Sequence, residues 1–154
     1  MKRFTFALLV IPVLISGCGL LGQLFPIQSG RGTVDPISGG AVTDLVSLVD
    51  NLRALGASVE PADDIEQVFF SVIGHIIRVN GEDVQVFEYA DRAAANSAAA
   101  LIAPDAGSIG TSMISWVATP HVYKSGRLIV LYIGDNRDIT ALLQNVLGPQ
   151  FAGR

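Results

Sequence analysis

The chain has 154 residues, with 10 Lys and Arg against 14 Asp and Glu for a formal net charge of −4. Half of its residues are hydrophobic and only 16% are charged, which fits one folded domain and excludes an intrinsically disordered protein. The acidic balance argues against a nucleic-acid partner, which needs clustered Lys and Arg, and the single Cys excludes an internal disulfide framework or a multi-Cys metal site.

The first 18 residues have the pattern of an export signal. A basic pair, Lys2 and Arg3, precedes an apolar run over residues 4–15, and small residues follow. The run is shorter than the roughly 20 residues that a transmembrane helix needs. Residues 15–18, Ile-Ser-Gly-Cys, resemble the lipobox of bacterial lipoproteins, which ends in the Cys that becomes acylated.

The lipobox resemblance implies a processing step and a location. Residues 1–17 would be a signal peptide that is removed after Gly17, and Cys18 would become the lipidated first residue of an extracytoplasmic protein. The membrane is then a partner through this lipid anchor, which holds well when two or more acyl chains are present. Gly19 is not the Asp that often marks inner-membrane retention in this class, so the outer membrane is favoured in an organism with two membranes. An ordinary cleaved signal with an incidental Cys is the alternative.

A linker and one domain follow the signal. Residues 18–40 are rich in Gly, contain Pro and show no helical or alternating pattern, which predicts a flexible tether behind the lipidated Cys. Residues 41–152 are expected to form a single globular α+β domain. Its first element is a helix over residues 45–55, with Thr43 as N-cap and Gly56 as the stop, because apolar residues recur there at helical spacing.

Two hairpin–helix units are expected after this helix. Residues 57–65 are polar and are interpreted as a connector. The first unit consists of strands over residues 68–79 and 84–89, bent at Gly74 and joined by an Asn80-Gly81 turn, and an Ala-rich helix over 92–103 capped by Asp91 and ended by Pro104. The second consists of strands over 113–124 and 128–133, bent at 118–120 and joined at Ser125-Gly126, and a helix over 136–147 capped by Asp135 and ended by Gly148.

Together these elements predict an α+β fold with an antiparallel sheet of about four to six strands and helices mainly on one face. The order is helix, two or three strands, helix, two or three strands, helix. An internal duplication is possible, with His75 aligned on His121 and Asp91 on Asp135, although hairpin turns and helix caps demand similar residues in any case. Residues 128–133 are all apolar, which indicates a strand buried on both faces or one that meets a ligand or partner.

No catalytic or metal-binding motif emerges from the sequence. Ser108 lies in a near match to the G-x-S-x-G elbow, but a helix is expected before it and a strand after it, the reverse of the required order. His75 and His121 lack metal-ligand spacing, and no phosphate-binding glycine motif is present. We therefore expect no metal, no cofactor and no enzymatic activity.

The candidate binding face lies at the expected bend in the second hairpin unit. Trp116 and Tyr123 flank the bend at Pro120, and together with His121 they are the proposed binding residues, with Trp116 and Tyr123 expected to be exposed. The favoured function is a non-enzymatic, lipid-anchored binding module of the cell envelope, whose partner is an envelope protein or a second copy of the chain. The alternatives are a carrier or sensor for a small apolar ligand, with the 128–133 strand lining the pocket, and an envelope hydrolase.

Overall fold

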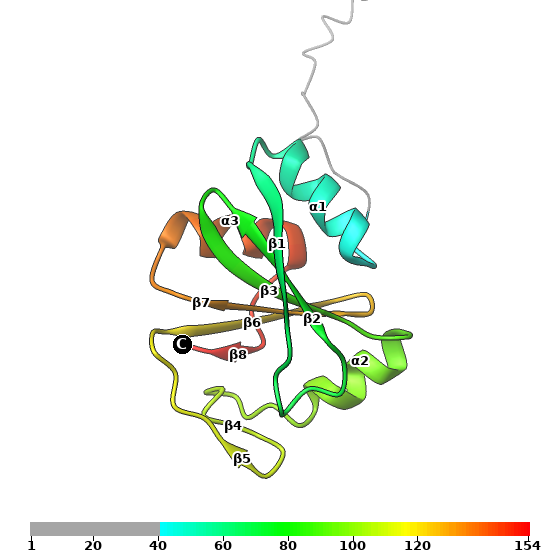
Figure 1. Cartoon of the computed structure of the whole chain (residues 1–154), viewed down its shortest axis with the longest axis vertical. Coiled ribbons are helices and arrows are strands. Elements are labelled where there is room, and N and C mark those ends of the chain that lie inside the picture. The colour runs from blue at the N-terminus through cyan, green and yellow to red at the C-terminus, as the bar shows by residue number, and fades with distance from the viewer. Residues whose placement is uncertain (1–40) are drawn as a thin grey trace, which may run out of the picture. The chain divides into compact units, whose positions relative to one another are not determined.

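The computed structural model describes residues 41–154, which all belong to one compact unit (Figure 1). The predicted signal peptide 1–17, its cleavage site at Gly17 and Cys18, and the tether 18–40 lie outside the described residues. The elements, in chain order, are α1 (Leu45–Ala54), β1 (Val59–Ile65), β2 (Gly74–Val79), β3 (Glu82–Glu88), α2 (Arg92–Ala99), β4 (Ser108–Ile109), β5 (Ser112–Met113), β6 (Pro120–Ser125), β7 (Leu128–Ile133), α3 (Arg137–Leu147) and β8 (Ala152–Gly153).

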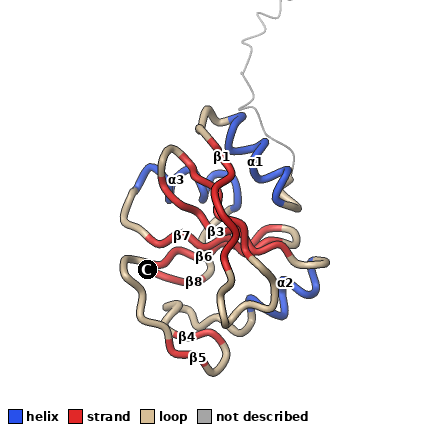
Figure 2. The backbone as a smooth tube through the Cα atoms, in the orientation of Figure 1, coloured by secondary structure: helices blue, strands red, loops and turns tan. Residues whose placement is uncertain are grey.

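Six of the strands, drawn in red with the other two in Figure 2, form one sheet in the order β1-β2-β3-β7-β6-β8. Every neighbouring pair in this sheet is antiparallel. Strands β4 and β5 form a separate two-stranded hairpin. This arrangement confirms the predicted α+β fold with an antiparallel sheet. The Asn80-Gly81 turn is also confirmed, because both residues have positive φ angles, 50° and 90°, as the two-residue hairpin requires.

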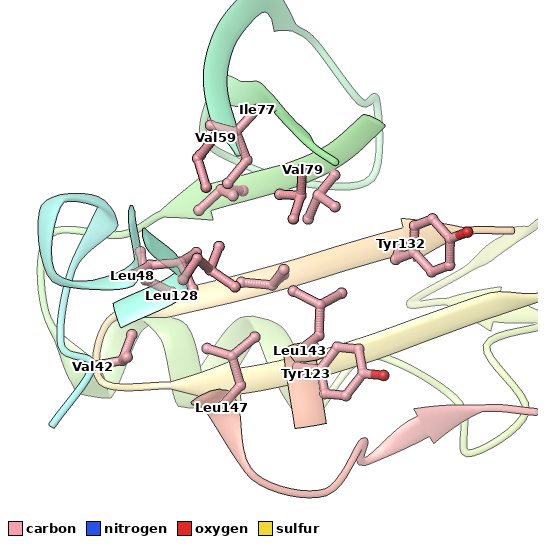
Figure 3. Packing of buried hydrophobic residues seen from close by; sticks show 14 of the residues in the cluster. Val42, Leu48, Val59, Ile77, Val79, Tyr123, Leu128, Tyr132, Leu143 and Leu147 are labelled. Carbon is pink, nitrogen blue, oxygen red and sulfur yellow. The ribbon is translucent and has the colours of Figure 1, made fainter. Parts of the chain in front are cut away.

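Strand β7 lies inside the sheet and is buried on both faces. Its side chains alternate between two hydrophobic cores, with Leu128 and Val130 in the first and Ile129 and Leu131 in the second. Helices α1 and α3 cover the first core, part of which is seen in Figure 3, and α2 covers the second. Two of the three helices therefore lie on one face, as expected, and the apolar strand is packed by the protein on both sides.

The two hairpin–helix units share their order but not their placement. Strands β3 and β7 are antiparallel neighbours, so a two-fold axis relating the two hairpins would stand perpendicular to the sheet and keep both helices on one face. Instead Ala95 of α2 packs into the second core and Ile139 of α3 packs into the first. The resemblance of the units is thus confined to the hairpins and the order of elements.

Three segments differ from the sequence prediction. Residues 57–65, expected as a connector, contain edge strand β1, whose polar side chains face solvent and hide the usual alternation. Residues 68–73, expected as a strand, form a loop that packs Phe70 against Phe87 with ring centroids 4.3 Å apart. Residues 114–117 are also irregular, since only Ser112–Met113 form β5.

The helix ends differ from prediction by one to a few residues. Asp44 rather than Thr43 caps α1, because it forms a reciprocal capping box with Ser47. Asn136 rather than Asp135 caps α3, its side chain accepting the Asp138 N–H. Helix α2 ends at Ala99, before the expected 103, whereas its Asp91 cap is confirmed. The end of α3 at Gly148 is also confirmed.

Substitution of Gly74 by Ala should destabilise the fold, because its Cβ would lie 2.5 Å from Cε1 of Phe87. Overpacking of this kind costs about 1–3 kcal/mol. Urea denaturation followed by circular dichroism measures the loss. In a Phe87→Leu background the added cost of Gly74→Ala should be smaller, since the clashing ring is gone. An equal cost in both backgrounds would contradict the packing explanation.

Candidate functional site

The structure separates the three predicted binding residues. Tyr123 is only 1% exposed and belongs to the first core, so its expected exposure is wrong. It sits in β6 between β7 and β8, where alternation turns it toward α3, and its hydroxyl donates to the carbonyl of Thr140 at 3.4 Å. Burial raises the pKa of Tyr123. Trp116 and His121, in contrast, each line a hollow at the surface.

The Trp116 hollow has a volume of about 410 Å³. Its lining comes from the turn that follows α2, the irregular chain before β6, and two more distant residues, Asp135 and Arg154. The indole of Trp116 is half-buried and held in place, because its Nε1 donates to the carbonyl of Ala106 at 2.7 Å. Its ring also meets Phe69 edge to face, with centroids 6.1 Å apart.

The His121 hollow, about 300 Å³, adjoins the Trp116 hollow. It is lined by Thr119, His121, Asp135, Arg137, Thr140 and Arg154. The two hollows share three of these residues, Thr119, Asp135 and Arg154, and therefore lie next to each other. The lining includes two arginines and one aspartate, so it offers polar and charged groups to a ligand.

The order of the strands brings the three shared residues together. Strand β6 lies between β7 and β8, and Pro120 pairs with Ile133 on one side while His121 pairs with Gly153 on the other. Thr119, Asp135 and Arg154 each lie one or two residues beyond these pairs, at the same end of the sheet. Their sequence separation gives no hint of this meeting, and it could not be predicted without the strand order.

Asp135 is available to the site because it does not cap α3. Its carboxylate accepts a hydrogen bond from the Thr119 hydroxyl, with Oγ1 and Oδ1 2.5 Å apart. Asn136 performs the capping instead, and the backbone N–H of Asn136 donates to the hydroxyl of Tyr132 at 3.2 Å. The one-residue shift of the cap therefore places an exposed carboxylate between the two hollows.

Both ring nitrogens of His121 are engaged by protein groups. Nδ1 lies 2.7 Å from Oε1 of Gln150, and Nε2 lies 3.2 Å from the carbonyl oxygen of Gly134. The imidazole is also stacked on Tyr132, with ring centroids 5.9 Å apart. A histidine held in this way forms a fixed wall of the hollow, whereas a general base needs a nitrogen that faces the substrate.

The other residues considered for chemistry lie elsewhere. His75 is in β2, which β3 and β7 separate from β6, and its Nδ1 lies 2.7 Å from Oδ1 of Asp64. Ser108 is in β4, and among residues 41–154 no hydrogen bond joins its hydroxyl to a histidine. Within the same residues, no group of three or more His, Cys, Asp or Glu side chains is arranged to hold a metal ion. None of the described helices has the length and apolar character needed to cross a membrane.

Three apolar side chains in the loop segments near Trp116 are almost fully exposed. We call them the apolar tips: Val68, Met113 and Val117, which are 94%, 87% and 97% exposed. Val68 and Val117 are the sequence neighbours of Phe69 and Trp116, whose rings touch. Figure 1 shows the β1–β2 loop and the β4–β5 hairpin at the same end of the molecule. The sequence analysis missed the tips because it interpreted both segments as strands.

Comparison with known proteins gives no relative from which a function could be transferred. No protein-family model matches the chain, and neither a curated protein nor a solved structure matches it significantly.

The hydrogen bonds of His121 predict its tautomer. A carbonyl oxygen can only accept, so the neutral ring should carry its proton on Nε2, facing Gly134. Oε1 of Gln150, the atom next to Nδ1, is an acceptor too, so beside that ring the Gln150 amide should turn over and donate to Nδ1 through its NH₂ group. Long-range ¹⁵N–¹H NMR of labelled protein distinguishes the two nitrogens. In Gln150→Leu the Nε2–H form should remain while the Nδ1 signal shifts. A neutral ring protonated on Nδ1 would contradict the arrangement.

Proposed function

We propose that the protein is a lipid-anchored, extracytoplasmic binding module of the cell envelope, without enzymatic activity, that engages an envelope protein. The lipobox resemblance at residues 15–18 supports the location, since it predicts a lipid on Cys18. The tether at residues 18–40 would hold the domain above the membrane surface. The apolar tips and the adjoining hollows are the proposed contact surface.

The observation that carries the proposal is the exposure of the apolar tips on segments that the Phe69–Trp116 ring contact brings together. Single exposed apolar side chains are common, but several together next to an aromatic residue are typical of a contact surface. Protein interfaces combine an apolar and aromatic centre with a polar rim, and Trp and Arg often supply much of the binding energy. Here Trp116 and the tips would form the centre, while Asp135 and Arg154 would form part of the rim.

The geometry of His121 supports a binding role over catalysis. Its ring nitrogens already contact Gln150 and Gly134. A nucleophile that used His121 as its general base would have to displace one of these contacts. The carrier alternative depended on the apolar strand Leu128–Ile133 lining a pocket. Because that strand packs into two protein cores, its composition has an explanation that needs no ligand.

Site-specific photo-cross-linking in cells tests the contact surface. A photoreactive amino acid at Val117 or Val68 should give a discrete adduct, because both side chains would lie against the partner. The matched control is Val46 on α1, which is also exposed, at 70%. An adduct of twice the protein's mass would identify a second copy as the partner. Absence of adducts at both tips, or the same adducts at Val46, would contradict the proposal.

The lipid anchor is tested separately. Substitution Cys18→Ala should abolish labelling by a palmitate analogue and move the protein from the membrane fraction to the soluble extracytoplasmic fraction. The matched control is Ser16→Ala, which keeps a small residue in the lipobox and should still be labelled. Labelling that persists in Cys18→Ala, or a wild-type protein that takes up no label, would contradict lipidation.

A further inference from the structure

Some basic side chains of the domain bind other groups of the same chain, and others do not. Residues 41–154 carry seven basic side chains against thirteen acidic ones. Four of the seven bind protein groups: Arg53 the Val59 carbonyl, Arg78 the Asp83 carboxylate, Lys124 the Asn96 side chain and Arg127 the Glu88 carboxylate. The guanidinium groups of Arg92, Arg137 and Arg154 have no hydrogen bond or ion pair within the described residues.

Two of these three arginines line the same cavity, the His121 hollow. In a domain with an excess of acidic residues, two arginines without an ion pair thus line one hollow of about 300 Å³. The lining also holds two acidic groups, the side chain of Asp135 and the carboxylate at the end of the chain on Arg154. Among the described residues neither acidic group forms an ion pair with Arg137 or Arg154, so both guanidinium groups remain available to an added anion.

The donors that remain in the hollow are the guanidinium N–H groups. The Thr119 hydroxyl donates to Asp135, and the Thr140 hydroxyl donates to the Arg137 carbonyl at 3.0 Å. His121 is occupied by Gln150 and Gly134. The planar guanidinium group matches carboxylate and phosphate oxygens with paired hydrogen bonds.

Charge distinguishes the two oxyanions. A phosphate monoester carries about −1.5 to −2 at neutral pH, which beside Asp135 exceeds the charge of the two arginines. A carboxylate carries one negative charge and is therefore repelled less by the acidic groups already in the lining. A carboxylate held there would also lie next to the Trp116 hollow, because Thr119, Asp135 and Arg154 border both cavities.

We propose that Arg137 and Arg154 bind a carboxylate of the partner polypeptide, and that an adjacent apolar side chain of the partner enters the Trp116 hollow. The inference rests on the proposed function, since it takes the partner to be a polypeptide. It adds the chemistry by which the partner is recognised: one carboxylate, from a chain end or an acidic side chain, next to an apolar group.

A titration of the full-length chain in detergent tests this assignment. The probe is N-acetyl-leucine, which joins one carboxylate to an apolar group, and the matched neutral probe is N-acetyl-leucinamide. Trp116 is the only Trp in the chain, so its fluorescence reports on the adjoining hollow. We expect a saturable change with the acid and at least tenfold weaker binding of the amide.

Substitutions identify the residues responsible. Arg137→Gln and Arg154→Gln should each weaken binding of N-acetyl-leucine at least tenfold. Neither guanidinium has a partner within residues 41–154, so both variants should keep the wild-type melting temperature. Arg92→Gln is the matched control, because it removes the third unpaired arginine from a different hollow and should bind like wild type.

Other outcomes overturn the assignment. Equal binding of acid and amide, or no saturable change with the acid, rejects carboxylate recognition. Tighter binding of inorganic phosphate than of N-acetyl-leucine assigns the hollow to phosphate, and tighter binding of glucuronate assigns it to an acidic saccharide. If cross-links at Val117 form while the titration fails, the proposed function stands and this inference falls. If the titration succeeds without cross-links, the hollow binds carboxylates but the protein partner is rejected.

Discussion

The burial of β7 on both faces is the constraint on which the rest of the domain depends. A strand with six apolar residues has to be covered twice, and each fully buried Leu, Ile or Val side chain contributes roughly 1.5–3 kcal/mol relative to exposure. One layer comes from α1 and α3, and the other from α2 with the aromatic loop around Phe70. This requirement places α2 and α3 on opposite faces although the two hairpins resemble each other.

The candidate site follows from the position of β6 within that sheet. With β7 on one side and the short β8 on the other, the ends of three chain segments meet where Thr119, Asp135 and Arg154 lie. The backbone fixes this meeting: the N–H of Arg154 donates to the Pro120 carbonyl, and that of Gly134 donates to the Thr119 carbonyl. The walls of the hollows are therefore attached to the most buried part of the domain, while the apolar tips project from loops.

Local sequence patterns were sufficient to predict some elements of the fold and insufficient to predict others. The Asn80-Gly81 turn, the Asp91 cap and strand β7 could be predicted because each depends on residues adjacent in the sequence. Residues 68–73 have the composition of a strand, yet Phe70 is needed to cover Phe87, and this tertiary contact overrides local preference. Trp116 and His121 could be proposed as site residues from the bend at Pro120. The other lining residues at positions 135, 137 and 154 could not be predicted, because their place beside the bend depends on the order of the strands.

Strand β1 has a consequence for how copies of the protein behave when crowded. It is the outer strand of the sheet, and an outer strand offers unpaired backbone groups to any neighbouring chain. In β1, Pro61 has no backbone N–H to donate. The acidic side chains of Glu60, Asp63 and Asp64 are exposed to solvent, and the register with β2 is irregular between Pro61 and Asp64. Such an edge is a poor template for another strand. Copies of the domain at high local concentration are thus expected to remain separate without stacking edge to edge into insoluble assemblies.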